Sequence, residues 1–149
     1  MDEGNASYIQ AQTLLNGSDS GESLVKAAEA MRLAANSGHT IAANSFGNLL
    51  HHGRGVHQDL SAARAYYLQA AEAGLPAARF NLGFMLVHGL GGERDEDRAR
   101  TLFLLAAEDG NLDAITHLGA MMMTGAGGAQ DFDSALAWWA RGADLGDSR

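Results

Sequence analysis

The chain has 149 residues, a length typical of a single domain. Its formal net charge of −8, from 10 basic and 18 acidic residues, argues against a surface that binds nucleic acid or anionic lipid. The absence of cysteine excludes disulfide bonds and thiolate metal sites, and no apolar run approaches the roughly 18 residues needed to span a bilayer.

Glycine, aspartate and alanine recur in this sequence with a fixed step of 36 residues. The series with this step include Gly38, Gly74, Gly110 and Gly146; Gly47, Gly83 and Gly119; Gly53, Gly89 and Gly125; and Asp59, Asp95 and Asp131. A fixed period between about 20 and 50 residues is the signature of a stacked-repeat architecture. The period therefore predicts the class of fold before any local motif is considered.

The repeat divides the chain into units that together form one solenoid domain, residues 1–149. We predict a degenerate first unit at residues 2–37, full units at 38–73, 74–109 and 110–145, and the start of a truncated further unit at 146–149. The first unit is weaker, as terminal repeats usually are, because one of its sides lacks a neighbouring repeat.

Each full unit reads as a first helix, a short glycine-containing turn and a second helix, called helix A and helix B below. In the second unit, apolar residues spaced three and four apart predict helix A over Thr40–His52. Gly47 falls in the middle of this helix, where glycine costs about 1 kcal/mol relative to alanine. Its recurrence as Gly83 and Gly119 indicates that a neighbouring helix packs against the bare backbone at this position.

Helix B of the second unit is predicted to begin after Asp59 and to end at about Ala73. Asp59 is the expected N-cap, because its carboxylate can accept hydrogen bonds from the first backbone N–H groups of the helix. Gly74 is suited to the left-handed conformation that commonly follows a helix. Asp95 and Asp131 are the expected caps in the later units.

The third and fourth units repeat the pattern. Pro76 falls in the first turn of helix A, where its missing N–H is harmless. In helix B of the fourth unit, Trp138 and Trp139 occupy the positions of Tyr66 and Tyr67. We expect these aromatic pairs to pack against the following unit, so the tryptophans read as core residues of an interrupted array. Self-association through the Trp138/Trp139 end is the alternative.

This skeleton resembles the Sel1-like repeats, a branch of the tetratricopeptide-like α/α solenoids. The resemblance rests on Ala42–Gly47, on Gly53–Asp59 and on Ala62–Gly74, and on their copies one and two periods later. One departure is that Leu50, Leu86 and Met122 stand where the family often has tyrosine. The resemblance implies an all-α fold, an α/α superhelical solenoid of antiparallel helix pairs, with a role in assembling other proteins and no usual enzymatic activity.

In related solenoids, the outer stripe of helix A lines the concave surface, and we expect a partner-binding groove there. Its candidate residues are Asn44, Asn48, His51, His52, Phe80, Phe84, Val87, His88, Thr116 and Met123. Phe80, Phe84 and Val87 would form an apolar strip, and exposed apolar patches commonly mark contact sites. The alternative is that superhelical curvature buries these residues between units. These positions carry no Lys or Arg, which argues against capture of a terminal carboxylate.

Other candidate sites have simpler explanations. The histidines, such as His52 and His88, lack a third ligand with fixed spacing, so no metal site is predicted. The glycine turns lack the preceding strand of a phosphate-binding loop, and they occur three times, which favours a structural turn. Paired acids such as Asp95 and Asp97 are better explained as residues at helix ends. We predict no catalytic residues, no metal and no cofactor.

The sequence therefore favours a non-catalytic scaffold or adaptor that binds a peptide or another protein. A hydrolase acting on cell-wall or β-lactam substrates, or a module that binds a small regulatory ligand, is the alternative. The chain as given, which starts with an acidic and polar segment, favours a cytoplasmic location, and a periplasmic one remains open for a trimmed form.

Overall fold

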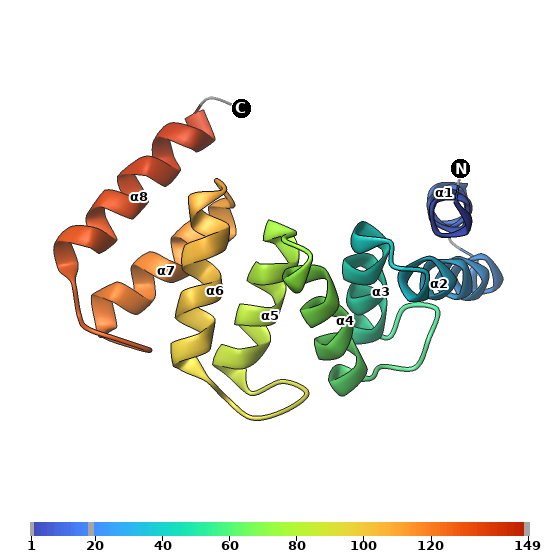
Figure 1. Ribbon diagram of the computed structural model, residues 1–149, viewed down its shortest axis with the longest axis horizontal. Helices are drawn as coiled ribbons and strands as arrows, with labels where there is room; N and C mark the ends of the chain where they lie inside the picture. Colours follow the sequence, from blue (N-terminus) through green and yellow to red (C-terminus); the bar gives the residue numbers. More distant parts are fainter. Residues whose placement is uncertain (1, 18–19, 148–149) are drawn as a thin grey trace. The chain divides into compact units, whose positions relative to one another are not determined.

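The computed structural model describes residues 2–17 and 20–147, and these residues form helices joined by short turns (Figure 1). The helices of the described residues are α1 (Glu3–Gly17), α2 (Gly21–Asn36), α3 (Thr40–His52), α4 (Leu60–Glu72), α5 (Pro76–His88), α6 (Glu96–Glu108), α7 (Leu112–Thr124) and α8 (Phe132–Asp147). They pack as sequential antiparallel pairs, one pair per repeat. The predicted all-α repeat fold is confirmed.

The chain divides into two compact units, Met1–Ala73 and Gly74–Arg149. Each comprises two consecutive repeats, and we call them unit 1 and unit 2 from here on. In unit 1, α3 packs against α4 of its own repeat and against α2 of the preceding one. In unit 2, α6 packs against α5 of its own repeat and against α7 of the following one (Figure 1). Each unit thus contains one complete interface between consecutive repeats.

Alanine forms most of the core at the contacts between helices. The fully buried larger side chains include Tyr67 in unit 1 and Phe103, Leu82 and Leu118 in unit 2. Small side chains let the helix backbones approach closely, and each aromatic ring fills the space that remains between helix A and helix B. No buried polar side chain is found among the described residues.

Aspartate caps begin the B helices where the sequence predicts them. The Asp59 carboxylate accepts from the Ala62 N–H at 2.9 Å, and that of Asp95 accepts from the Arg98 N–H at 3.0 Å. Asp131 accepts from the Ser134 N–H at 3.0 Å, and the Ser134 hydroxyl together with this bond holds the pKa of Asp131 below its usual range. These bonds satisfy backbone donors that the first turn of a helix leaves without partners.

Glycine ends the A helices and follows the B helices. Gly53, the C-cap of α3, has φ +66°, a left-handed conformation that side chains resist. Gly74 and Gly110 have φ of +95° and +84° after α4 and α6. Gly146, one period later, lies inside α8, which runs to Asp147. The further unit at 146–149 stays a prediction, and its residues 148–149 lie outside the described residues.

None of the helices in the described part of the chain is long and apolar enough to cross a membrane.

Candidate functional site

A glycine in each of the A helices α3, α5 and α7 lies directly under an aromatic ring of the B helix of the same repeat. A Cβ at Gly47 would lie 2.7 Å from Cε1 of Tyr67, and one at Gly83 would lie 2.7 Å from Cε1 of Phe103. At Gly119, an added Cβ would overlap the indole of Trp139. The three glycines thus let the two helices of a hairpin approach, and this contact determines which face of helix A points outward.

The aromatic pairs of the B helices pack only in part as expected from the sequence. The second member, as in Tyr67, packs inside its own repeat, whereas the Tyr66 hydroxyl donates to Oδ1 of Asn36, on α2 of the preceding repeat. The expectation that the pairs pack against the following repeat therefore holds only in part: Phe103 packs on Gly83 of its own repeat, and its ring also lies 5.4 Å from that of His117 on the following one. The two members of a pair point about 100° apart on the helix and so meet different neighbours.

Of the two tryptophans of α8, Trp139 packs inside its own repeat, on Gly119. Trp139 is half-buried and its Nε1–H donates to the Thr116 carbonyl at 3.3 Å. Trp138 is also half-buried, and the Arg141 guanidinium lies 5.0 Å from its ring centroid. Self-association through this end stays a prediction.

In unit 1, the candidate groove residues are polar and partly engaged within the repeat. Asn48 is exposed, and its Oδ1 accepts from the Tyr67 hydroxyl at 2.6 Å. The rings of His51 and His52 stack, with centroids 4.7 Å apart and planes 10° apart. Asn44 is half-buried. This part of the predicted groove offers hydrogen-bonding groups and one stacked ring pair.

Two pKa shifts accompany these contacts. Loss of hydration on burial, followed by repulsion from His52, lowers the pKa of His51 below its ordinary value of 6.5. Burial raises the pKa of Tyr67 far above its ordinary value, so that this phenol stays neutral and donates to Asn48. Near neutral pH, this end of α3 therefore carries less positive charge than its two histidines suggest.

In unit 2, Phe80 and Phe84 are half-buried in a cluster of rings. His117, on α7, lies with its ring centroid 5.1 Å from that of Phe80, 5.4 Å from that of Phe103 and 6.1 Å from that of Phe84. The ring of His88 lies 4.4 Å from that of Phe84 on the outer side. The apolar strip expected from the sequence is thus partly covered by the next A helix, and it keeps an aromatic edge bordered by two imidazoles.

The remaining candidates lie along the same helices. Val87 and Met123 are half-buried, whereas His88 and Thr116 are exposed. The Thr116 hydroxyl donates to the Leu112 carbonyl at 3.1 Å within α7. His117 was not among the groove residues expected from the sequence, because its contacts come from the packing of α7 on α5 and α6, which no local pattern encodes.

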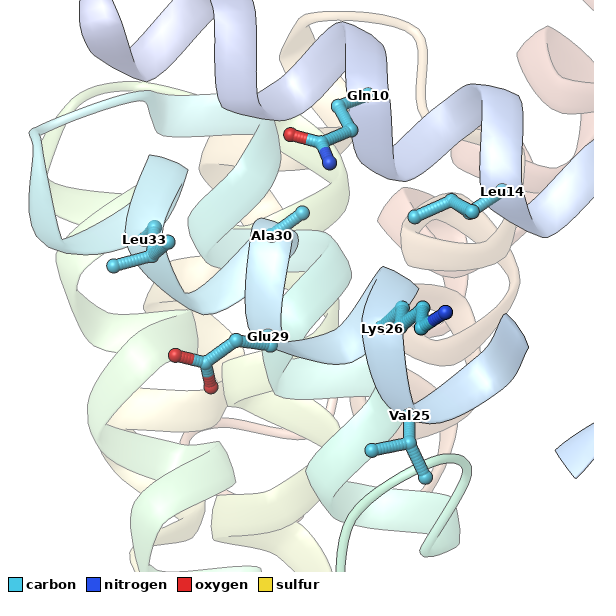
Figure 2. A pocket seen from close by; sticks show the side chains of 7 residues that line it. All are labelled: Gln10, Leu14, Val25, Lys26, Glu29, Ala30 and Leu33. Carbon is cyan, nitrogen blue, oxygen red and sulfur yellow. The ribbon is translucent and has the colours of Figure 1, made fainter. Parts of the chain in front are cut away.

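A hollow on another surface was also not expected from the sequence. It lies between α1 and α2, has a volume of about 400 Å³ and is lined by Gln10, Leu14, Val25, Lys26, Glu29, Ala30 and Leu33 (Figure 2). In the next repeat, the positions of Gln10 and Ala30 carry Phe46 and Tyr66, whose rings meet edge to face at 4.8 Å. The hollow therefore lies where the first repeat lacks this aromatic pair.

The described residues contain no cluster of three or more histidine, aspartate or glutamate side chains able to hold a metal ion.

Comparisons with known proteins agree with this geometry. A family model described as Sel1 repeat matches residues 41–75, 76–111 and 112–147. The chain is similar to the crystal structure of c5321, a protective antigen present in uropathogenic Escherichia coli strains and displaying an SLR fold, with 31% identity and a TM-score of 0.90. It is also similar to a Sel1 repeat protein from Oxalobacter formigenes, with 27% identity and a TM-score of 0.87.

These matches cover 96% and 95% of this chain, but only 31% and 58% of the two longer chains. A search of curated proteins finds no significant match.

Proposed function

Because the chain belongs to the Sel1 repeat family, we propose that it is a non-catalytic scaffold that binds a peptide or protein partner through its A helices. The contact surface in unit 2 consists of Phe80, Phe84, Val87, His88 and Met123, which we call the helix-A surface. Thr116 lies beside it, and Asn44, Asn48, His51 and His52 form the corresponding polar set in unit 1.

The observation that carries this proposal is the partly exposed aromatic edge of α5. Phe84 stands between His88 at 4.4 Å and His117 at 6.1 Å, so an apolar ring is bordered by two hydrogen-bonding imidazoles. Aromatic anchors carry much of the binding energy at many interfaces. The chemistry suits a partner that offers an apolar side chain flanked by backbone or hydroxyl groups.

The charge of the chain narrows the class of partner. With a net charge of −8 and no Lys or Arg among the candidate residues, the helix-A surface disfavours polyanions such as nucleic acid and acidic lipid surfaces. A neutral or basic segment of a protein is the better match.

Site-directed photocrosslinking tests the proposal. A photoreactive phenylalanine analogue at position 87 should capture a partner in cells, and the same analogue at Thr101, which is exposed on α6, should not. The partner identified in this way should then bind the purified chain, and Phe84→Glu should weaken that binding at least about tenfold, as expected for an interface anchor. Thr101→Glu is the matched control.

Equal crosslinking at positions 87 and 101, or binding that is unchanged by Phe84→Glu, would contradict the proposed surface.

A further inference from the structure

Helix α8 presents an apolar face that no described residue of the chain covers. Phe132 and Leu136 are 54% and 57% exposed, although both are large hydrophobic residues. Ala140 and Ala143, one and two turns further along α8, are exposed as well. Among the described residues of α8, only Ala135 is buried. We call the surface formed by Phe132, Leu136, Ala140 and Ala143 the α8 outer face.

Within unit 2, the same face of α6 shows what covers such a surface. Glu96 and Arg100 stand 36 positions before Phe132 and Leu136. The turn after α7 lies on them, so closely that a Cβ at Gly127 would overlap the Glu96 carbonyl and lie 3.2 Å from the Arg100 Cβ. The Arg100 guanidinium donates to the carbonyls of Ala126 and Ala129 at 3.2 and 2.9 Å.

Unit 1 contains the same arrangement. The turn after α3 lies on α2, where a Cβ at Gly55 would overlap the Leu24 carbonyl and lie 3.2 Å from the Ala28 Cβ. Leu24 and Ala28 stand at the positions of Glu96 and Arg100. Two independent interfaces therefore place the second glycine of a Gly-X-Gly turn on the carbonyl near the start of a B helix.

Glycine is required at this contact for two reasons. Gly55 and Gly127 have φ of +72° and +70°, which side chains rarely adopt, and neither position has room for a Cβ. A surface of this kind therefore recognises the Gly-X-Gly backbone itself. On α8, the replacement of Glu96 and Arg100 by Phe132 and Leu136 adds apolar area around the equivalent carbonyl.

We propose that the α8 outer face is a docking site for a helical hairpin whose connecting turn carries the Gly-X-Gly pattern. The hairpin would continue the repeat interface seen between α6 and α7, with its second turn glycine on the Phe132 carbonyl. Another copy's first repeat does not offer this group, because Asp19 stands at the position of Gly55. Residue 19 itself lies outside the described residues.

The experiment supplies such a hairpin and asks whether α8 becomes covered. Residues 1–145 are followed by a second copy of residues 110–145, which keeps the 36-residue step. Ala143→Cys is the reporter, since the chain contains no other cysteine. Docking should slow the reaction of this reporter thiol with a thiol reagent at least about tenfold relative to the original chain, because reaction would then require local opening.

Two controls make the result specific. In the first, the counterpart of Gly127 in the added hairpin is replaced by valine, which should restore fast labelling. In the second, the reporter is Ala137→Cys, at a position exposed in every repeat, and its labelling should be unchanged. Leu136→Arg, which introduces the residue type found at this position in α4 and α6, should preserve docking, whereas Leu136→Asp should abolish it.

Unchanged labelling of the thiol at position 143 in the extended chain would overturn the proposal. Equal slowing with the valine-containing hairpin would also overturn it, because the glycine would then not be recognised. If labelling in the original chain slows as protein concentration rises, a second copy covers the face, and the proposed preference for a Gly-X-Gly hairpin is wrong.

Discussion

Helices α6 and α8 carry equivalent faces 36 residues apart. The following repeat covers the face of α6, whereas the face of α8 is open. Ala107 on α6 is fully buried, whereas its counterpart Ala143 on α8 is exposed. Arg100 donates to two carbonyls of the following turn, whereas its counterpart Leu136 is 57% exposed. The following repeat therefore supplies the burial of this face.

The opposite side of the same two helices differs less, since Phe103 is fully buried and Trp139 is half-buried. Ala99 and Ala135 are both fully buried, and Phe103 and Trp139 both pack on the glycine of their own A helix. A hairpin thus completes one side of its core by itself and relies on its neighbour for the other side. This division is the basis of nearest-neighbour stability in repeat proteins.

The largest expected effect comes from the contact inside a hairpin. Gly83→Leu should lower the free energy of unfolding by roughly 3 kcal/mol or more, because Phe103 is fully buried and cannot move away. Gly146→Leu is the matched control, since Gly146 lies in α8 with no atom within 4 Å of an added Cβ. Chemical denaturation measures both, and an equal response would show that the close helix contact is absent.

The contact between repeats should give the next effect. Gly110→Ala should cost about 1 kcal/mol from its positive φ alone, whereas Gly127→Ala should cost roughly 2–3 kcal/mol. Both glycines have positive φ, but only Gly127 lies against the backbone of another helix. The difference between the two variants in denaturation therefore measures the interface, and no difference would mean that the turn does not rest on α6.

Arg100→Ala should cost about 1–2 kcal/mol, since two hydrogen bonds from a charged group to the turn are lost. The equivalent change on the open face, Leu136→Ala, should stay within about 0.5 kcal/mol, as is usual for surface substitutions. Thermal unfolding of the two variants compares the faces directly. A larger loss for Leu136→Ala would indicate that α8 is already covered in solution.

Removal of a helix cap should cost less than the loss of packing. Asp95→Ala should lower stability by about 1 kcal/mol, the usual value for an N-cap. Asp97→Ala, in the first turn of the same helix, should cost about 0.5 kcal/mol through the helix dipole alone. If denaturation ranks the two variants in the reverse order, the assignment of Asp95 as the cap is wrong.

The smallest effect concerns pH at the end of α3. Because the pKa of folded His51 is lowered, its contribution to stability is complete above the ordinary pKa of 6.5 and is lost as pH falls through the folded value. The melting temperature should therefore fall more between about pH 7.5 and 5.5 in the wild type than in His51→Gln. His57→Gln, at an exposed turn position, should keep the wild-type slope, and parallel slopes for all three proteins would exclude the shift.

Much of the fold could be predicted because the repeat places the same local signals three times. The caps such as Asp95 follow from backbone chemistry that acts within a few residues. The mid-helix glycines such as Gly83 are locally unfavourable, so their recurrence indicates the close helix contact. The ring cluster around His117 could not be predicted in this way, since its members come from α5, α6 and α7. The hollow beside Ala30 depends on which side chains are missing from the first repeat, and the periodic skeleton does not reveal this.

The most direct test of the central claim compares one thiol on each of the two equivalent faces. Ala107→Cys and Ala143→Cys, made separately in this cysteine-free chain, should both fold, because the change in side-chain size is small. If the neighbouring repeat covers α6 and leaves α8 open, the thiol at position 143 should react with a thiol reagent at least about a hundredfold faster than the thiol at position 107 under native conditions. Equal rates for the two thiols would contradict the account.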